Sequence, residues 1–319
     1  MSSALVFGIV LISSHRCSSS SKTMVSTFNK IHSVCRSSHP YPRSEVQRVP
    51  VADDKVSWTI DHPEYKPVEF TQPFIHGQVW ADEDITPENK SQFKWNTLDE
   101  HQVNRVGHNG VYTIDPDSGR PRNPFGRTGL SGRGSLGRWG PNHAADPLVT
   151  RWMKNEEGEV VKDPESGKPR LEFLAIQRRV GKMWALPGGM VDKGEQALDT
   201  AQRELCEEAL NSSEWNLNED KQQKHLVSEL FAKSEPVYKG YIDDARNTDN
   251  AWMETVALHA HDPTGSNVAK LNLIAGDDAV DVKWMPVEAK TTLFANHNDL
   301  IRIVAHNMDA HWSNEKDLS

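Results

Sequence analysis

The chain contains, from residue 188 onward, the glycine-rich stretch Gly188-Gly189-Met190-Val191-Asp192-Lys193-Gly194-Glu195, which is followed after seven residues by Arg203-Glu204-Leu205-Cys206-Glu207-Glu208. On an α-helix, Glu204, Glu207 and Glu208 stand at positions i, i+3 and i+4, so they share one face. Three carboxylates this close repel one another unless a cation lies among them. We predict a tight glycine loop and then a helix over 197–210 whose acidic face binds a metal ion.

A solvated acidic helix face is the plainer interpretation of the same residues. It leaves unexplained why glycines directly precede the helix. It also leaves unexplained an apolar stripe, predicted to be buried, beside the acids: Ala197, Leu198, Ala201 and Leu205. The metal-binding interpretation accounts for both observations, and we prefer it.

Mg²⁺ suits the three glutamates, because it prefers hard oxygen ligands and shares its remaining positions with water and phosphate. Mn²⁺ is the alternative ion. Such a metal neutralises charge on a pyrophosphate and lowers the pKa of a bound water. We therefore predict that Glu204, Glu207 and Glu208 are catalytic metal ligands. Arg203 lies one turn before Glu207 and is predicted to orient a glutamate side chain.

These residues resemble the signature of the Nudix hydrolases. The matching positions, in identity and spacing, are Gly189, Glu195, Arg203, Glu204, Leu205, Glu207 and Glu208. The signature's glycine near the end of the helix is missing, because Ala209 and Leu210 follow Glu208. The resemblance implies an α/β fold, namely the Nudix α/β/α sandwich with a mixed sheet.

Four further segments, 137–147, 238–241, 247–255 and 295–297, are similar to one branch of that family, the ADP-ribose pyrophosphatases of animal mitochondria. An ADP-ribose-sensing domain of a melastatin-type cation channel is related to this branch. The resemblance implies an N-terminal accessory domain before the Nudix domain. It also implies that ADP-ribose is hydrolysed to AMP and ribose 5-phosphate.

The same resemblance assigns four positions to substrate contact: Asp244, Arg246, Leu293 and Asn296. Turn residues that cap backbone groups are the alternative for Asp and Asn in such segments. Arg178 and Arg179 follow a predicted strand over 171–176, so alternation turns one of them toward a diphosphate and the other away.

Several other residues are candidates for roles near the site. Glu254, Asp249 or a glutamate of the acidic helix is the candidate general base. His143 and His297 fall in family-like segments and are expected close to the site. Trp252 is the tryptophan most suited to stack on adenine, although a buried core position is the commoner role.

The chain divides into three parts: a leader over 1–44, a small turn-rich and mostly β domain over 45–140, and the Nudix domain over 141–314. The expected strands of the second part are 56–60, 68–70 and 111–114. In the third part we expect strands at 253–260 and 280–285 and helices ending near 231 and 305. The Gly- and Arg-rich segment 126–140 either meets phosphate or connects the domains.

The first 44 residues contain no Asp or Glu, many serines and five basic residues, a composition typical of a mitochondrial transit peptide. An apolar run at 4–12 is too short to span a membrane, and a secretory signal is the rival interpretation. A start at Met24 would instead leave a cytoplasmic protein.

The net charge of −9 disfavours nucleic acid as a partner. The three cysteines have neither a disulfide pattern nor a zinc-ligand spacing. We expect a monomer with a small-molecule substrate. A module that binds ADP-ribose without cleaving it would not need the three glutamates. A hydrolase for another nucleotide, such as NADH, a diadenosine polyphosphate or capped RNA, stays open.

Overall fold

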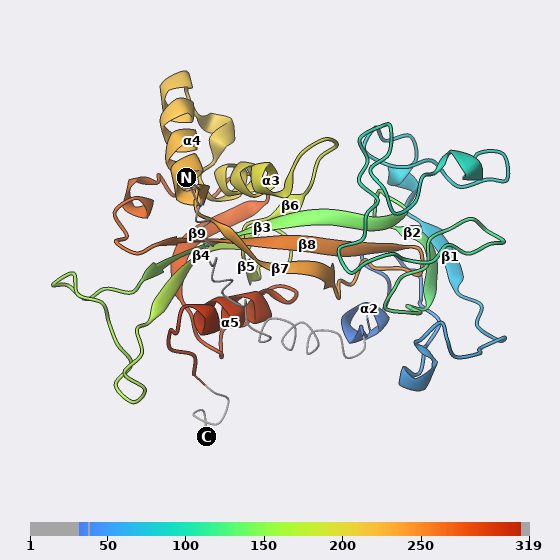
Figure 1. Ribbon diagram of the computed structural model, residues 1–319, viewed down its shortest axis with the longest axis horizontal. Coiled ribbons are helices and arrows are strands. Elements are labelled where there is room, and N and C mark those ends of the chain that lie inside the picture. Colours follow the sequence, from blue (N-terminus) through green and yellow to red (C-terminus); the bar gives the residue numbers. More distant parts are fainter. Residues whose placement is uncertain (1–31, 38, 314–319) are drawn as a thin grey trace, which may run out of the picture.

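The computed structural model describes residues 32–37 and 39–313. Its main body is a sheet, seen edge-on in Figure 1, with helices on both faces and the N-terminal part of the chain at one end. This arrangement is the predicted α/β sandwich. The expected leader lies outside the described residues up to position 31. Within the described part, no helix combines the length and apolar character needed to cross a membrane.

The sheet is mixed and has the strand order β5-β4-β3-β8-β7, with β6 paired to β3 and β9 paired to β4. Its strands are β3 (Gly140–Trp152), β4 (Leu171–Arg178), β5 (Trp184–Ala185), β6 (Gly189–Met190), β7 (Glu235–Ile242), β8 (Ala251–Asp262) and β9 (Ala279–Pro286). The central strands β3 and β8 run parallel, and the other pairs are antiparallel. The expected strands at 171–176, 253–260 and 280–285 are thereby confirmed.

Each face of the sheet buries its own apolar cluster because neighbouring side chains of a strand point to opposite faces. In β3, Leu148 packs toward α5 (His297–Asn307), whereas Val149 packs toward α3 (Ala197–Glu204) and α4 (Leu217–Phe231). Figure 1 shows α3 and α4 on one side and α5 on the other. Helix α4 begins at a capping box, in which the Asn216 and Glu219 side chains accept from one another's backbone N–H groups.

The acidic helix differs from its prediction in its last turn. It is α-helical only over α3, and the residues Leu205–Ala209 form a π-helical turn, η4. Ala201 and Leu205 are buried as expected, but Leu198 is 40% exposed, so the predicted apolar stripe is wrong at that position.

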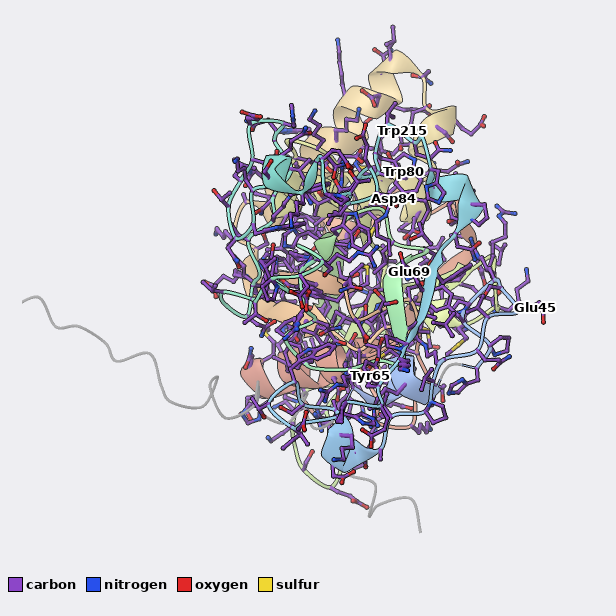
Figure 2. The ribbon with its side chains drawn as sticks, turned by 90° about the vertical axis from the view of Figure 1, so that its right-hand side faces the viewer. Glu45, Tyr65, Glu69, Trp80, Asp84 and Trp215 are labelled. Atoms are coloured by element: carbon purple, nitrogen blue, oxygen red, sulfur yellow. The ribbon has the colours of Figure 1, made fainter. Side chains whose placement is uncertain are left out.

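The N-terminal part is turn-rich, as expected, but not mostly β. Its two strands, β1 (Val68–Thr71) and β2 (Leu130–Gly134), pair in parallel, and three short 3-10 helices accompany them: η1 (Asp53–Lys55), η2 (Pro73–Ile75) and η3 (Lys90–Gln92). Figure 2 faces this end, where Tyr65, Glu69, Trp80 and Asp84 are labelled. The expected strands 56–60 and 111–114 do not form. Around 56–60 the reason is Arg127, whose guanidinium takes up the carbonyls of Lys55, Ser57 and Ile60 in place of a neighbouring strand.

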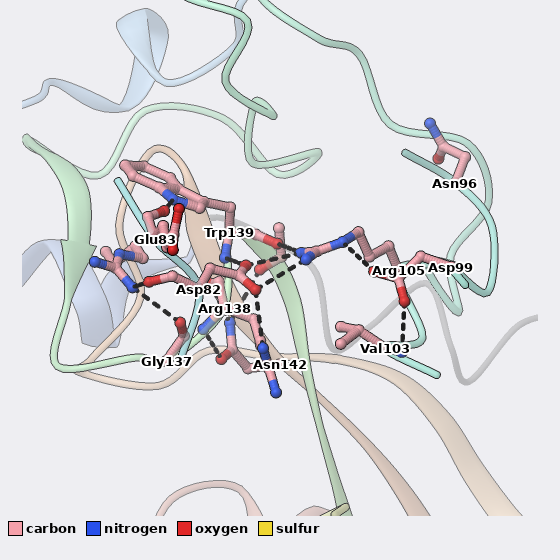
Figure 3. A network of polar contacts seen from close by, with 12 residues as sticks. Asp82, Glu83, Asn96, Asp99, Val103, Arg105, Gly137, Arg138, Trp139 and Asn142 are labelled. Atoms are coloured by element: carbon pink, nitrogen blue, oxygen red, sulfur yellow. Dashed lines mark hydrogen bonds and ion pairs between the residues drawn. The ribbon is translucent and has the colours of Figure 1, made fainter. Parts of the chain in front are cut away.

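Arginines of segment 126–140 form ion pairs inside the N-terminal domain. Figure 3 shows buried Asp82 accepting hydrogen bonds from Arg105, Arg138 and the backbone N–H of Trp139 at 2.8–2.9 Å. Arg133 donates to Asp84 at 2.8 Å. These guanidinium groups are used for pairing within the domain, which argues against a role in phosphate binding.

The predicted leader boundary at residue 44 is too late. Helix α2 (Ser33–Ser37) donates the backbone N–H groups of Val34 and Cys35 to Asp243, at 2.8 and 2.9 Å. The Tyr41 hydroxyl donates to the carbonyl of Arg246 at 2.8 Å. Both Cys35 and Tyr41 are fully buried. Residues from about 32 therefore belong to the folded part, because they pack against β7 and the loop after it.

Candidate active site

A cavity of about 300 Å³ opens where β3 and β4 separate. The two strands pair only at residues 150–152 of β3, and β6 then pairs with β3 at Ala144 and Ala145. The cavity is lined by charged and amide side chains from both halves of the sheet: Asp146, Arg178, Glu204, Glu208, Asp244, Arg246, Asp277, Asp278 and Asn296. This polar lining in a concave site is suited to a charged small molecule.

Two of the three predicted metal ligands enter this cavity. Glu204 and Glu208 are buried and line it, and Glu208 accepts a 2.9 Å hydrogen bond from the backbone N–H of Gly188. Glu207 does not line the cavity, and its side chain is 37% exposed. The π turn explains the difference, because its wider spiral keeps Glu208 in line with Glu204 and turns Glu207 aside.

Arg203 holds the acidic cluster together. Its guanidinium donates to Glu195 and Glu207 at 3.0 Å and to Glu204 at 2.7 Å, and to the carbonyl of Met190 at 3.0 Å. Ion pairs with several hydrogen bonds fix the geometry of each partner. This arrangement supports the orienting role predicted for Arg203, and it places Glu195 in the support of the site.

The two glycines of the loop allow the backbone to approach the acids. A Cβ atom on Gly188 would lie 2.3 Å from Asp146 Oδ1, and one on Gly189 would lie 2.2 Å from Glu204 Oε1. Any other residue at these positions would displace a carboxylate. The glycine loop is thus part of the site rather than a simple turn.

Burial raises the pKa values of three of the acids that line the cavity. The pKa of Glu204 rises to about 7, that of Glu208 to about 8 and that of Asp146 to about 6, in each case mainly through desolvation. A divalent cation would reverse this effect by favouring the charged forms. The set of hard carboxylate oxygens fits Mg²⁺ or Mn²⁺.

The cavity lining also includes two arginines, Arg178 and Arg246. Arg178 lines the cavity with its guanidinium 4.4 Å from the ring centre of Phe294, whereas Arg179 donates to the carbonyls of Asp277 and Ala279. Only one of the adjacent pair thus faces the site, as strand alternation predicts. Arg246 forms a bidentate pair with buried Asp244, with two bonds of 2.8 Å.

Of the two later positions assigned to the substrate, only one reaches the cavity. Asn296 lines it, next to the N-terminus of α5. Leu293 does not; it is buried in the apolar cluster beneath α5. The structure thus places the side chain of Leu293 in the core and not in the lining of this cavity.

Three other expected neighbours of the site also lie elsewhere. Asp249 accepts from Thr128 and the Tyr65 hydroxyl, and so it holds the N-terminal part. Glu254 contacts His108 and His143. None of Asp249, Glu254 and His143 lines the cavity, which argues against Asp249 and Glu254 as the base.

The remaining two predicted residues have clear structural roles. Trp252 is fully buried against Tyr112 and cannot stack on adenine in this cavity. His297 lines the cavity, and its Nδ1 accepts from the backbone N–H of Leu186 at 2.8 Å. Burial lowers the pKa of His297 to about 3, so the ring stays neutral.

The sequence interpretation missed Asp146, Asp277, Asp278 and Phe294 as lining residues. Asp146 falls in the family-like segment 137–147, which was a usable signal. Asp277 and Asp278 stand just before β9, where an acidic pair also fits an ordinary loop.

Comparisons with known proteins agree with this fold. A family profile described as "NUDIX domain" matches residues 160–305, and one described as "NUDT9-like, N-terminal domain" matches residues 51–140. The chain is 48% identical over 286 residues to the "ADP-ribose pyrophosphatase, mitochondrial" of Rattus norvegicus, covering 89% of this chain and 80% of that protein. The chain therefore belongs to the Nudix family and is a hydrolase of that family by both fold and similarity.

Two further relatives show how widely this pair of domains is used. The "Putative nudix hydrolase 6" of Caenorhabditis elegans is 43% identical over 277 residues, which are 86% of this chain and 96% of that protein. The "Transient receptor potential cation channel subfamily M member-like 2" of Nematostella vectensis is 43% identical over 283 residues, which are 88% of this chain but 18% of the channel.

Proposed function

We propose that this protein hydrolyses the pyrophosphate bond of ADP-ribose to AMP and ribose 5-phosphate, with Mg²⁺ or Mn²⁺ as cofactor. The observation that carries the proposal is the cavity in which Glu204 and Glu208 face Arg178 and Arg246. The similarity to a named ADP-ribose pyrophosphatase over most of both chains supports the substrate.

In this proposal Glu204 and Glu208 hold the metal, with Glu207 beside them. When bound, the ion neutralises charge on the pyrophosphate and makes a bound water more acidic. Arg203 keeps the glutamates in position, and the N–H of Gly188 fixes one oxygen of Glu208. The protein thus supplies a preorganised set of carboxylates, which reduces the cost of assembling the charged site.

Arg178, Arg246 and Asn296 form the substrate side of the proposed site. Arg178 is placed to pair with the diphosphate, because guanidinium groups bind phosphate through charge-assisted hydrogen bonds. Apart from Asp244, which is paired with Arg246, the lining carboxylates outside the helix are Asp146, Asp277 and Asp278. We propose that the general base is one of these three or a glutamate of the helix.

Two other activities would use the same fold. A binding module that does not cleave its ligand is disfavoured by the acids retained in the cavity. A different nucleotide substrate, such as NADH, is the second alternative. To distinguish it from ADP-ribose, the protein is incubated with Mg²⁺ and a panel of nucleoside diphosphate derivatives, and the products are identified by mass. AMP and ribose 5-phosphate from ADP-ribose at the highest kcat/KM are expected, and preference for NADH would refute the substrate assignment.

We also propose that the protein acts as a monomer in mitochondria, directed there by the basic, serine-rich segment that ends before residue 32. The mitochondrial location named for the rat relative supports the proposal. A fluorescent fusion of the full chain should colocalise with a mitochondrial marker, and one that starts at Met24 tests the cytoplasmic alternative. Retention in the secretory pathway would contradict both. We propose domain limits of 45–140 and 141–314, with residues 32–44 packed against both domains.

A further inference from the structure

Three metal-ligating side chains meet at the junction of the two domains, away from the cavity. They are His108 from the N-terminal domain, His143 from β3 and Glu254 from β8, and their ligand atoms all lie within 4.8 Å of one another. His143 and Glu254 are direct partners in the parallel pairing of β3 with β8. The sheet therefore fixes two of the three residues, and the N-terminal domain brings the third.

None of the three cluster residues lines the cavity of the proposed active site. Ala144 and Met253 line the cavity, and they are the chain neighbours of His143 and Glu254. Because side chains of a strand alternate between faces, His143 and Glu254 point away from the cavity. The two sites share no side chain, so each can be tested without the other.

The carboxylate of Glu254 is fully buried and is held by two hydrogen bonds and by two imidazoles. Its Oε1 accepts from Trp252 Nε1 at 2.9 Å, and its Oε2 accepts from the backbone N–H of His108 at 2.5 Å. Within the described residues, its ion-pair contacts are the two imidazoles, at 3.6 Å to His143 Nε2 and 3.9 Å to His108 Nδ1. A buried carboxylate without a cation is costly, and a metal ion would compensate it.

The spacing of the ligand atoms fits a tetrahedral metal site. Bonds of about 2.0–2.1 Å require ligand atoms roughly 3.4 Å apart. The distances from Glu254 Oε2 to His143 Nε2 and to His108 Nδ1, 3.6 and 3.9 Å, are longer than this. The carbonyl oxygen of Val106 accepts a hydrogen bond from His143 Nε2 at 3.1 Å. On metal binding, His143 Nε2 would lose the proton that it donates to this oxygen, and the oxygen could then act as a fourth ligand. The imidazole rings of His108 and His143 are stacked, with their centres 4.5 Å apart. Rotations of these side chains would bring one nitrogen of each ring to a shared ion.

We propose that His108, His143 and Glu254 form a site for Zn²⁺ or a similar first-row transition metal, which fastens the N-terminal domain to the Nudix sheet. Two imidazoles and one carboxylate are donors that favour such ions over Mg²⁺. The donors are histidine and glutamate rather than the cysteines. An ion held by both domains would stabilise their docking through its preference for the folded state.

The test uses the full chain carrying Glu204→Gln and Glu208→Gln, so that the cavity no longer competes for the added metal. Titration with Co²⁺, followed by its visible absorption, and with Zn²⁺ by calorimetry should show one equivalent bound, with the strong absorption of tetrahedral cobalt. His108→Asn and His143→Asn, each added to this background, should weaken binding at least tenfold. The melting temperature should rise with Zn²⁺ in the background and not in these variants.

A matched control is His259→Asn, because His259 belongs to a second buried histidine pair, in which the Thr150 hydroxyl lies 2.8 Å from both His259 and His261. It should bind Co²⁺ as the background does. The proposal is overturned if the background binds no Co²⁺ or Zn²⁺, or if His108→Asn and His143→Asn bind within twofold of it. Should both histidine variants fail to fold, Glu254→Gln replaces them with the same expectation.

Discussion

Arg246 and Asp244 show how a single pair of residues prepares the cavity for an anion. Their bidentate ion pair lies in the cavity wall, and the backbone of Arg246 is held in turn by the hydroxyl of Tyr41. The arginine therefore has two effects. It offers positive charge to the ligand and neutralises a buried carboxylate that would otherwise repel phosphate.

We expect Arg246→Ala to raise KM for ADP-ribose about tenfold or more, or roughly 1.4 kcal/mol, with a smaller effect on kcat. The reason is that the contact is remote from the metal and serves the ground state and the transition state alike. Steady-state kinetics on purified protein measure both constants. Arg302→Ala, which removes an exposed arginine paired with Asp299, is the control. A loss confined to kcat would instead place Arg246 at the reacting phosphorus.

The raised pKa values of Glu204 and Glu208 make the metal-free protein sensitive to pH. Both carboxyls bind protons more tightly in the folded state, so the stability they contribute is complete below their unfolded pKa of about 4.3 and is lost as pH rises through about 7 and about 8.

In EDTA, the wild type should therefore lose several kcal/mol of stability relative to the Glu204→Gln/Glu208→Gln variant between about pH 5 and pH 9. Denaturant melts at several pH values measure this difference. With Mg²⁺ present the loss should disappear, and metal binding at neutral pH should release protons. A difference in stability that does not change with pH would contradict the burial of these two groups.

At the scale of the elements, the loop and helix were largely predictable and the last helical turn was not. Glycine spacing and the i, i+3, i+4 acids predicted the loop, the helix and the metal face. The π turn escaped prediction, because periodicity assumes a uniform α-helix. Ala209 and Leu210 in place of the signature glycine were the one indication that the end of the helix departs from the usual pattern. The core position of Leu293 was not predicted for a related reason, since a family-like segment does not reveal which of its side chains point into the core.

Gly189→Ala should leave the fold intact and reduce activity at least tenfold. The added Cβ would meet the end of the Glu204 side chain, which can move, but the carboxylate would then leave its position in the cavity. Weaker Mg²⁺ binding should accompany the loss, measured by metal titration of kcat.

Gly158→Ala is the control for this substitution. Gly158 has a φ of +82° and open space around it, so alanine there costs about 1 kcal/mol through the backbone without touching the site. If both alanine variants lose activity equally, the loss does not come from the close approach of Gly189 to Glu204.

At the scale of the whole molecule, composition predicted the leader and the domain order but not where the leader ends. A serine-rich basic segment has the same composition whether or not its last residues pack. Burial of Cys35 and Tyr41 depends on Asp243 and Arg246, which lie some two hundred residues later in the chain. Contacts at such separation cannot be read from local sequence. The same dependence on distant residues explains why the expected strand 56–60 does not form, because the guanidinium of Arg127 takes the place of a strand partner.

Removal of residues 1–31 should leave turnover and melting temperature unchanged. Removal of residues 1–43 should lower the melting temperature by several degrees and raise KM for ADP-ribose, because Tyr41 no longer supports the backbone of Arg246. Thermal melts and steady-state kinetics on both proteins decide the matter. Equal behaviour of the two truncated proteins would mean that residues 32–43 contribute nothing to the fold.

The central claim is that the carboxylates in the cavity hold the metal that drives hydrolysis. Glu204→Gln with Glu208→Gln keeps side-chain volume and removes both charges, so the fold should survive. Turnover of ADP-ribose should fall at least about a thousandfold, or roughly 4 kcal/mol, while binding of ADP-ribose by calorimetry falls much less. Glu156→Gln with Glu157→Gln, on an exposed turn, should retain full activity. A folded Glu204→Gln/Glu208→Gln protein that hydrolyses ADP-ribose within tenfold of wild type would contradict the claim.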